Sequence, residues 1–192
     1  ISVGTITPEE YLSGELTSEC KHELIEGHAY AMAGASANHE RIAQNISREF
    51  GVHLKNLPCE PFGSDMKVRV GNNFFYPDVL VDCSFDESQP YYTQTPVIIV
   101  EVISRSTRKT DEQLKRLQYT SIGGLKEYVL VEQDFVDITV FRENDSWRPT
   151  HYFLGDDILF ESIELTLSVE EIYHRVHNED MIQFLQDKEQ EQ

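Results

Sequence analysis

The sequence has little of three things: long apolar runs, cysteine and basic side chains. Its longest apolar run, Pro96–Val100, is broken by Glu101. A membrane span needs about 20 apolar residues, so we expect no membrane association. The three cysteines, Cys20, Cys59 and Cys83, are an odd number without CxxC spacing. They argue against a disulfide framework or a zinc knuckle and fit a reducing cytoplasm.

Basic residues are outnumbered, with 16 Lys and Arg against 34 Asp and Glu and a formal net charge of -18. A surface of this sign repels nucleic acid, which binds proteins through basic patches that release counterions. A nucleic-acid substrate would have to be met at a local patch or through bound metal ions. Hydrophobic residues make up 40% of the chain, which is enough for a substantial core and argues against disorder.

Periodicity and capping residues predict alternating helices and strands. Helices are expected at about 8–12, 36–56, 108–122 and 169–176, a hairpin at 23–32, and strands at 66–70, 74–83, 96–103, 127–131, 136–142 and 147–153. This order predicts an α/β (α+β) fold with a central mixed β-sheet flanked by helices, plus an N-terminal helix and hairpin and a C-terminal β extension. We expect one domain over 1–186 and a disordered tail at 187–192.

Two acidic residues stand within apolar strands: Asp78 follows Phe74–Pro77, and Glu101 ends Pro96–Val100. Burial of a carboxylate is costly unless it is paired, hydrogen-bonded or bound to a metal. If the two strands are neighbours, the carboxylates meet, and a divalent cation would neutralise their repulsion. Alternatively, each carboxylate ends a strand or pairs with an arginine, and the spacing leaves both interpretations open.

The next helix carries Asp111, Lys115 and Tyr119 four residues apart, so they form one stripe. An exposed Asp–Lys pair is one explanation. The other is that Lys115 points over the end of the Glu101 strand, where its ammonium group would stabilise charge on a scissile phosphate.

Three segments together resemble the Uma family of endonuclease-like proteins, which is abundant in cyanobacteria and belongs to the restriction-endonuclease-like PD-(D/E)xK superfamily. They are Tyr76–Asp82, Val100–Arg108 and Asp111–Tyr119. The segment Glu23–Gly27 with Met32, and His39 in the long helix, also match the family pattern. The resemblance covers about residues 5–175 and implies a restriction-endonuclease-like core.

The resemblance implies Mg²⁺-dependent hydrolysis of phosphodiester bonds in DNA, with Mn²⁺ as the alternative ion. Asp78 and Glu101 are the implied metal ligands, together with the Val102 carbonyl. The superfamily usually has its lysine two residues after the Glu, where this chain has Ile103. The family pattern places the catalytic lysine on the following helix, at Lys115.

Four further residues are implied as auxiliary to the site: Glu26, His39, Asp111 and Tyr119. His39 shares a line with Ile42 and Ile46, so it faces inward, as either a structural or a catalytic histidine. A homodimer would suit cleavage of two strands. The alternative to an enzyme is a non-catalytic binding or assembly module on a nuclease-like fold, which the charge of -18 and the missing strand lysine favour. If Lys115 is catalytic, its loss is expected to impair cleavage but to leave folding near wild type.

Overall fold

The computed structural model describes residues 5–104 and 110–190, except for the side chains of 110–112. The helices are α1(Pro8–Glu15), α2(Ala37–Leu54), η1(Thr110–Lys115), α3(Arg116–Tyr119), η2(Glu143–Asp145), η3(Glu161–Ile163), α4(Val169–Ile172) and α5(Glu179–Gln190). The strands are β1(His22–Ile25), β2(His28–Ala31), β3(Glu60–Gly63), β4(Lys67–Val70), β5(Asn73–Phe75), β6(Val79–Asp82), β7(Tyr92–Thr93), β8(Pro96–Ile103), β9(Glu127–Glu132), β10(Ile138–Arg142), β11(Pro149–Tyr152), β12(Asp157–Phe160) and β13(Leu165–Ser168).

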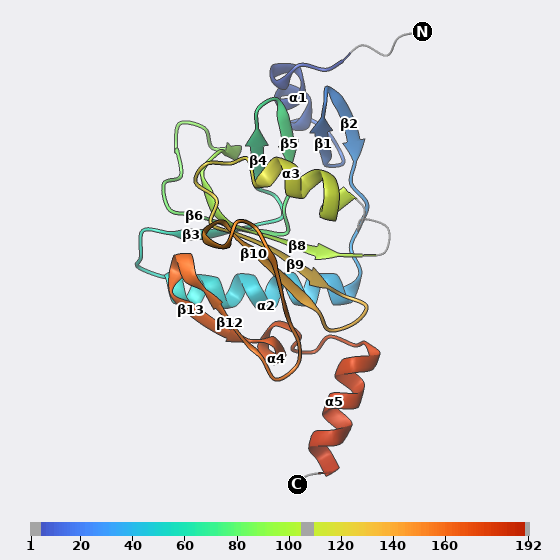
Figure 1. Cartoon of the computed structure of the whole chain (residues 1–192). Helices are drawn as coiled ribbons and strands as arrows, with labels where there is room; N and C mark the ends of the chain where they lie inside the picture. The colour runs from blue at the N-terminus through green and yellow to red at the C-terminus, as the bar shows by residue number, and fades with distance from the viewer. Residues whose placement is uncertain (1–4, 105–109, 191–192) are drawn as a thin grey trace.

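Most of the strands form two sheets (Figure 1). The six-stranded sheet has the order β11-β10-β9-β8-β6-β3, and the five-stranded sheet has the order β2-β1-β5-β4-β7. Within the larger sheet β8 and β9 are parallel, whereas β8 and β6 are antiparallel. The predicted α+β fold with a mixed sheet and flanking helices is therefore confirmed.

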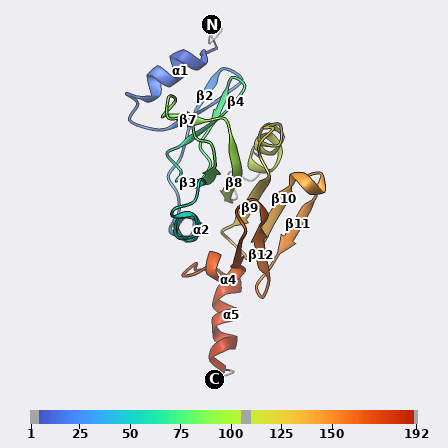
Figure 2. The ribbon, with the colours of Figure 1, turned by 90° about the vertical axis from the view of Figure 1, so that its left-hand side faces the viewer.

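The larger sheet has a different partner on each face. On one face, Val79, Val100 and their neighbours pack with Ile42 and Ile46 of α2. On the other face, Leu80 and Ile99 belong to a second cluster, which includes Tyr119 of α3 and Val68 and Phe75 of the five-stranded sheet. In Figure 2, α2 and the five-stranded sheet lie apart from each other, with the central strands β8 and β9 between them. Because consecutive strand residues point to opposite faces, the continuous apolar run of β8 serves both clusters.

Several helix signals are confirmed. Ser36 caps α2, and its hydroxyl accepts a hydrogen bond from the N–H of His39. Capping boxes join Thr7 to Glu10 and Ser168 to Glu171, as predicted.

The C-terminal prediction was wrong in two respects. The helix expected over 169–176 ends at Ile172. A separate helix, α5, runs from Glu179 to Gln190, so residues 187–190 are helical rather than disordered. The carboxylates of Glu179 and Asp180 favour a helix start there, and Met181 is buried against the core. Residues 191–192 lie outside the described part. Figure 1 shows α5 extending away from the sheets.

The strand expected over 74–83 is two strands that belong to different sheets. It breaks at Tyr76–Asp78, between β5 and β6, where Pro77 cannot donate a ladder hydrogen bond. This break places Asp78 at the junction of the two sheets. The sequence analysis also missed β3, an edge strand containing Pro61, because proline weakens a strand pattern but is tolerated at an edge.

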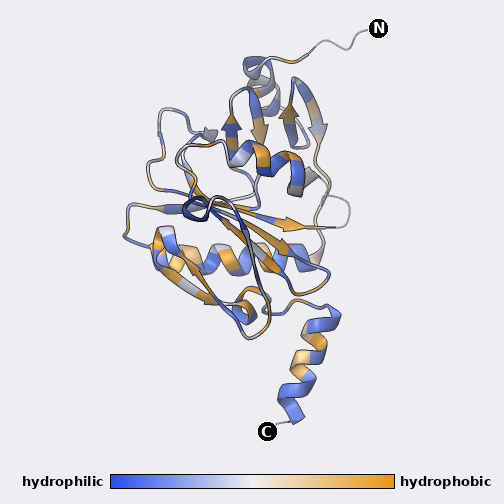
Figure 3. Ribbon diagram, viewed as in Figure 1, coloured by the Kyte–Doolittle hydropathy of each residue, from blue (hydrophilic) through white to orange (hydrophobic). Residues whose placement is uncertain are grey.

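Hydropathy follows the layers. Figure 3 shows the central strands β8 and β9 as largely hydrophobic, whereas α2 alternates between hydrophobic and hydrophilic residues. Among the described residues, no helix is long and apolar enough to cross a membrane.

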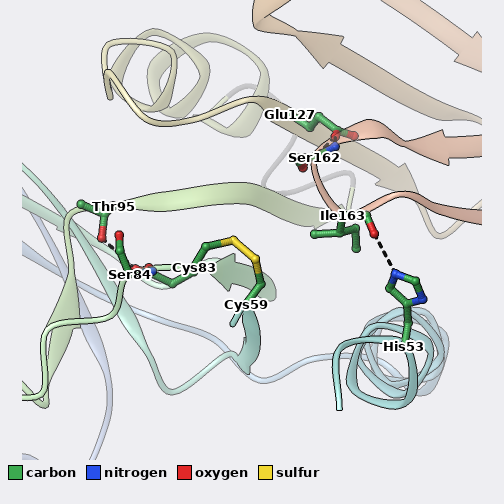
Figure 4. Close-up of a disulfide and its surroundings, with 9 residues drawn as sticks. His53, Cys59, Cys83, Ser84, Thr95, Glu127, Ser162 and Ile163 are labelled. Carbon is green, nitrogen blue, oxygen red and sulfur yellow. Dashed lines mark hydrogen bonds between the residues drawn. A yellow bond between two sulfur atoms is a disulfide. The ribbon is translucent and has the colours of Figure 1, made fainter. Parts of the chain in front are cut away.

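A disulfide joins Cys59 to Cys83 (Figure 4), contrary to the expectation of unpaired thiols. The register of β3 and β6 pairs Glu60 with Asp82, so the two cysteines stand opposite each other just beyond the ladder. Without β3, the sequence offered no reason to pair residues 24 positions apart. The cysteine count therefore no longer supports a reducing compartment. Cys20 is an exposed free thiol.

Candidate active site

Strand pairing brings Asp78 and Glu101 to the same end of the six-stranded sheet. In the antiparallel pair of β6 and β8, Val79 lies opposite Val100, so Asp78 and Glu101 occupy the next opposed positions. The main-chain N–H of Val102 donates to Oδ2 of Asp78 over 2.6 Å. Asp78 is thus fixed beside the segment that carries Glu101.

Glu101 is buried, with 3% of its surface exposed, and among the described residues Tyr119 and Lys115 meet its charge. Its Oε1 accepts a hydrogen bond from the Tyr119 hydroxyl over 2.9 Å and lies 3.2 Å from Nζ of Lys115. Burial, and then the nearby charge of Glu101, raise the pKa of Tyr119 well above its usual value. Tyr119 therefore remains a hydrogen-bond donor that orients this carboxylate.

Lys115 is buried in the same cluster, with 5% of its surface exposed. Its Nζ lies 2.9 Å from Oε1 of Glu23, in addition to its contact with Glu101. It ends the π-helical segment η1, a rare conformation that occurs often at functional sites. Ile103, at the position where the superfamily usually has its lysine, faces the same side of β8 as Glu101. Lys115 therefore brings an ammonium group from the following helix to the face on which that lysine would lie.

Glu23 belongs to this cluster, although the sequence analysis did not name it as a site residue. In β1, Leu24 packs with Phe74, whereas Ile25 packs against the cluster that contains Tyr119. Glu23 shares the face of Ile25 because side chains alternate along a strand. That alternation was the available signal, but it required knowing which side of the hairpin meets the helix of Lys115.

His39 approaches Asp78 from the opposite layer, on α2. Its Nε2 lies 3.2 Å from Oδ1 of Asp78, and its side chain is 17% exposed. His39 thus faces inward, as predicted, and contacts a candidate metal ligand.

Two auxiliary residues predicted from the sequence are not placed in this cluster. Glu26 is exposed at the hairpin turn, with a φ of 51°, and its N–H donates to Asn73. The side chain of Asp111 lies outside the described residues. The six residues whose positions meet at this end of the sheet are Glu23, His39, Asp78, Glu101, Lys115 and Tyr119.

The structure also contains an open groove of about 830 Å³. Its lining consists of residues 36–38, Ser104, Gln133, Asp134 and His177. Residues 36–38 directly precede His39, and Ser104 directly follows β8. The groove therefore borders the segments that carry His39 and Glu101.

The donor types in the cluster suit a hard divalent cation, since Mg²⁺ prefers carboxylate and carbonyl oxygens. Within the described parts of the chain, no three His, Cys, Asp or Glu side chains are arranged to hold an ion. A site formed by Asp78, Glu101 and the Val102 carbonyl needs only two acidic side chains. In this structure Glu101 faces Lys115, and Asp78 faces His39 and the N–H of Val102.

Comparison with known proteins shows consistent similarities. Residues 8–170 match the Uma2 family, described as "Putative restriction endonuclease". Two proteins of Synechocystis sp. are similar: uncharacterized protein slr1290 is 36% identical over 88% of this chain and 91% of its own length, and uncharacterized protein sll1609 is 35% identical over 67% and 75%. A crystal structure from Anabaena variabilis, titled as a "putative nuclease belonging to DUF820", has a TM-score of 0.75 at 18% identity, covering 88% of this chain and 97% of that one.

Proposed function

This chain belongs to the Uma2 family, and we propose that it is a Mg²⁺-dependent endonuclease that hydrolyses phosphodiester bonds in DNA. The observation that carries the proposal is the position of Lys115. A buried ammonium group is costly to desolvate, yet Lys115 is buried with its Nζ 3.2 Å from Glu101 and 2.9 Å from Glu23. Its position supports a chemical role on the face of the sheet that carries Glu101.

In this proposal Asp78, Glu101 and the Val102 carbonyl hold the ion. The bound ion supplies Lewis acidity and an activated water for attack at phosphorus. Tyr119 orients Glu101 through its hydrogen bond, and His39 orients Asp78 from the other side. Lys115 stabilises negative charge that develops on the phosphate oxygens.

DNA must approach a protein with a net charge of -18, so the contact has to be local. The groove beside residues 36–38 is open, and its lining includes amide, hydroxyl and imidazole groups that can bond to phosphate, together with the carboxylate of Asp134, which repels it. A homodimer would place two such sites on opposite strands of a duplex.

The test is cleavage of supercoiled plasmid and single-stranded DNA by wild-type protein with Mg²⁺ or Mn²⁺. We expect Lys115→Ala, assayed at a temperature where circular dichroism shows it folded, to lower the cleavage rate by about 10²–10³, as losses of charge-stabilising groups do. Asp78→Asn should also lower the rate, because it removes a ligand of the ion. Lys126→Ala is the matched control, because Lys126 is a half-exposed lysine that pairs with Glu143 over 3.1 Å. It should cleave at the wild-type rate. Cleavage that survives in both site variants would contradict the assignment and indicate a contaminating nuclease.

A second candidate function is a non-catalytic binding or assembly module. The observation that favours it is that Asp78 and Glu101 both face protein partners in this structure. Absence of wild-type cleavage with either metal and on every substrate would support this alternative.

A further inference from the structure

One carboxylate oxygen of Glu23 meets two groups within the cluster. Its Oε1 lies 2.9 Å from Nζ of Lys115 and 3.1 Å from the main-chain N of Tyr76. Its side chain is 10% exposed, so water screens this charge only weakly. Tyr76 begins the segment that leads to Asp78, so Glu23 contacts the segment of Asp78 as well as Lys115.

The helix that bears Lys115 is held by its aromatic neighbours. The ring of Tyr119 packs edge-on against Phe75 and Tyr128, with centroids 5.4 Å apart in each pair. The guanidinium of Arg116 lies over the ring of Phe141, 4.6 Å from its centroid. These contacts fix the backbone of α3, but a lysine side chain keeps several rotatable bonds and needs its own anchor.

In the proposed function Glu101 is shared between the ion and Lys115, because its Oε1 faces Lys115 in this structure. Glu23 has no such second task in the proposed function. Its carboxylate can keep the ammonium in place when Glu101 turns toward another ligand.

The geometry points to Glu23 as a positioning residue that holds Lys115 over the reacting phosphate. This inference rests on the proposed function, and it assigns Glu23 no contact with substrate. The neutral variant Glu23→Gln keeps an oxygen to accept the Tyr76 N–H but removes the charge that holds Lys115.

The test reads the Lys115 amine directly by trace acetylation with acetic anhydride and mass spectrometry at pH 8. In Glu23→Gln we expect Lys115 to react about 10-fold faster than in wild type, because a side chain that has lost its anchor leaves the buried cluster more often and meets the reagent. Glu143→Gln is the matched control: it removes the partner of half-exposed Lys126 at a similar distance and should change the reactivity of Lys126 by less than about 2-fold. Glu23→Asp retains the charge and should leave Lys115 within about 3-fold of wild type, and it serves if Glu23→Gln does not fold.

Cleavage kinetics supply the second measurement. We expect Glu23→Gln to lower kcat about 10-fold with little change in KM. Unchanged Lys115 reactivity in Glu23→Gln, or changed reactivity with wild-type kcat, would overturn the inference. If wild-type protein cleaves no DNA, the proposed function fails, and equal labelling of Lys115 in wild type and Glu23→Gln would separately refute the anchoring by Glu23.

Discussion

Replacement of Lys115 by methionine should destabilise the fold strongly. Lys115→Met keeps most of the side-chain volume, so its main effect is to remove the ammonium group. Glu23 and Glu101, at 8% and 3% exposure, would then be buried carboxylates without their shared cation. Breaking a buried ion pair by removing one partner typically costs about 3–5 kcal/mol. Sequence reasoning had instead predicted near-normal folding, because it could not show that Lys115 is buried.

A double variant tests whether the cost comes from the two buried carboxylates. Lys115→Met/Glu101→Gln removes one of the two charges and should recover at least about 1 kcal/mol at pH 8, while Tyr119 can still donate to the amide oxygen.

Urea unfolding followed by circular dichroism measures these differences. With a slope of about 2 kcal/mol per molar, a loss of 3–5 kcal/mol lowers the midpoint by about 1.5–2.5 M at pH 8. A loss below about 1 kcal/mol in Lys115→Met, or no recovery in Lys115→Met/Glu101→Gln, would refute the burial of Lys115 between two charged carboxylates.

Three further outcomes are expected. Mg²⁺ or Mn²⁺ at 100 times its Kd should stabilise the folded wild type by about 2.7 kcal/mol and so raise its melting temperature. Asp78→Asn should lose most of that gain, and an equal gain in the variant would place the ion elsewhere. Replacing Cys59 and Cys83 by serine should lower the free energy of unfolding by about 3.4 kcal/mol, because the bridge closes a loop with a sequence separation of 24. Urea unfolding measures this loss, and no difference from oxidised wild type would mean that the bridge is not formed in solution. Burial raises the pKa of Glu127, although Ser162 donates two hydrogen bonds to its carboxylate, so ionisation of Glu127 opposes folding. As the pH rises from about 4.5 through that raised pKa, the stability of wild type should therefore fall relative to that of Glu127→Gln. Parallel curves of stability against pH for the two proteins would contradict this.

The sequence by itself determined the elements whose signals are local. Ser36 and the two capping boxes mark helix starts through hydrogen bonds within four residues, and the apolar run of β8 shows a strand buried on both faces. Asp78 and Glu101 stood out because a carboxylate in an apolar strand needs a partner. The family pattern added Lys115, which local spacing alone could not distinguish from an exposed ion pair.

Tertiary structure decided everything that depends on which segments meet. The break at Pro77 sends β5 and β6 into different sheets, and the pairing of β3 with β6 sets Cys59 opposite Cys83. Glu23 and Glu26 are three residues apart with the same side chain, yet only Glu23 faces the helix of Lys115. A strand fixes which residues share a face, but the surface opposite that face comes from segments about 90 residues away in the sequence, and no local pattern encodes it.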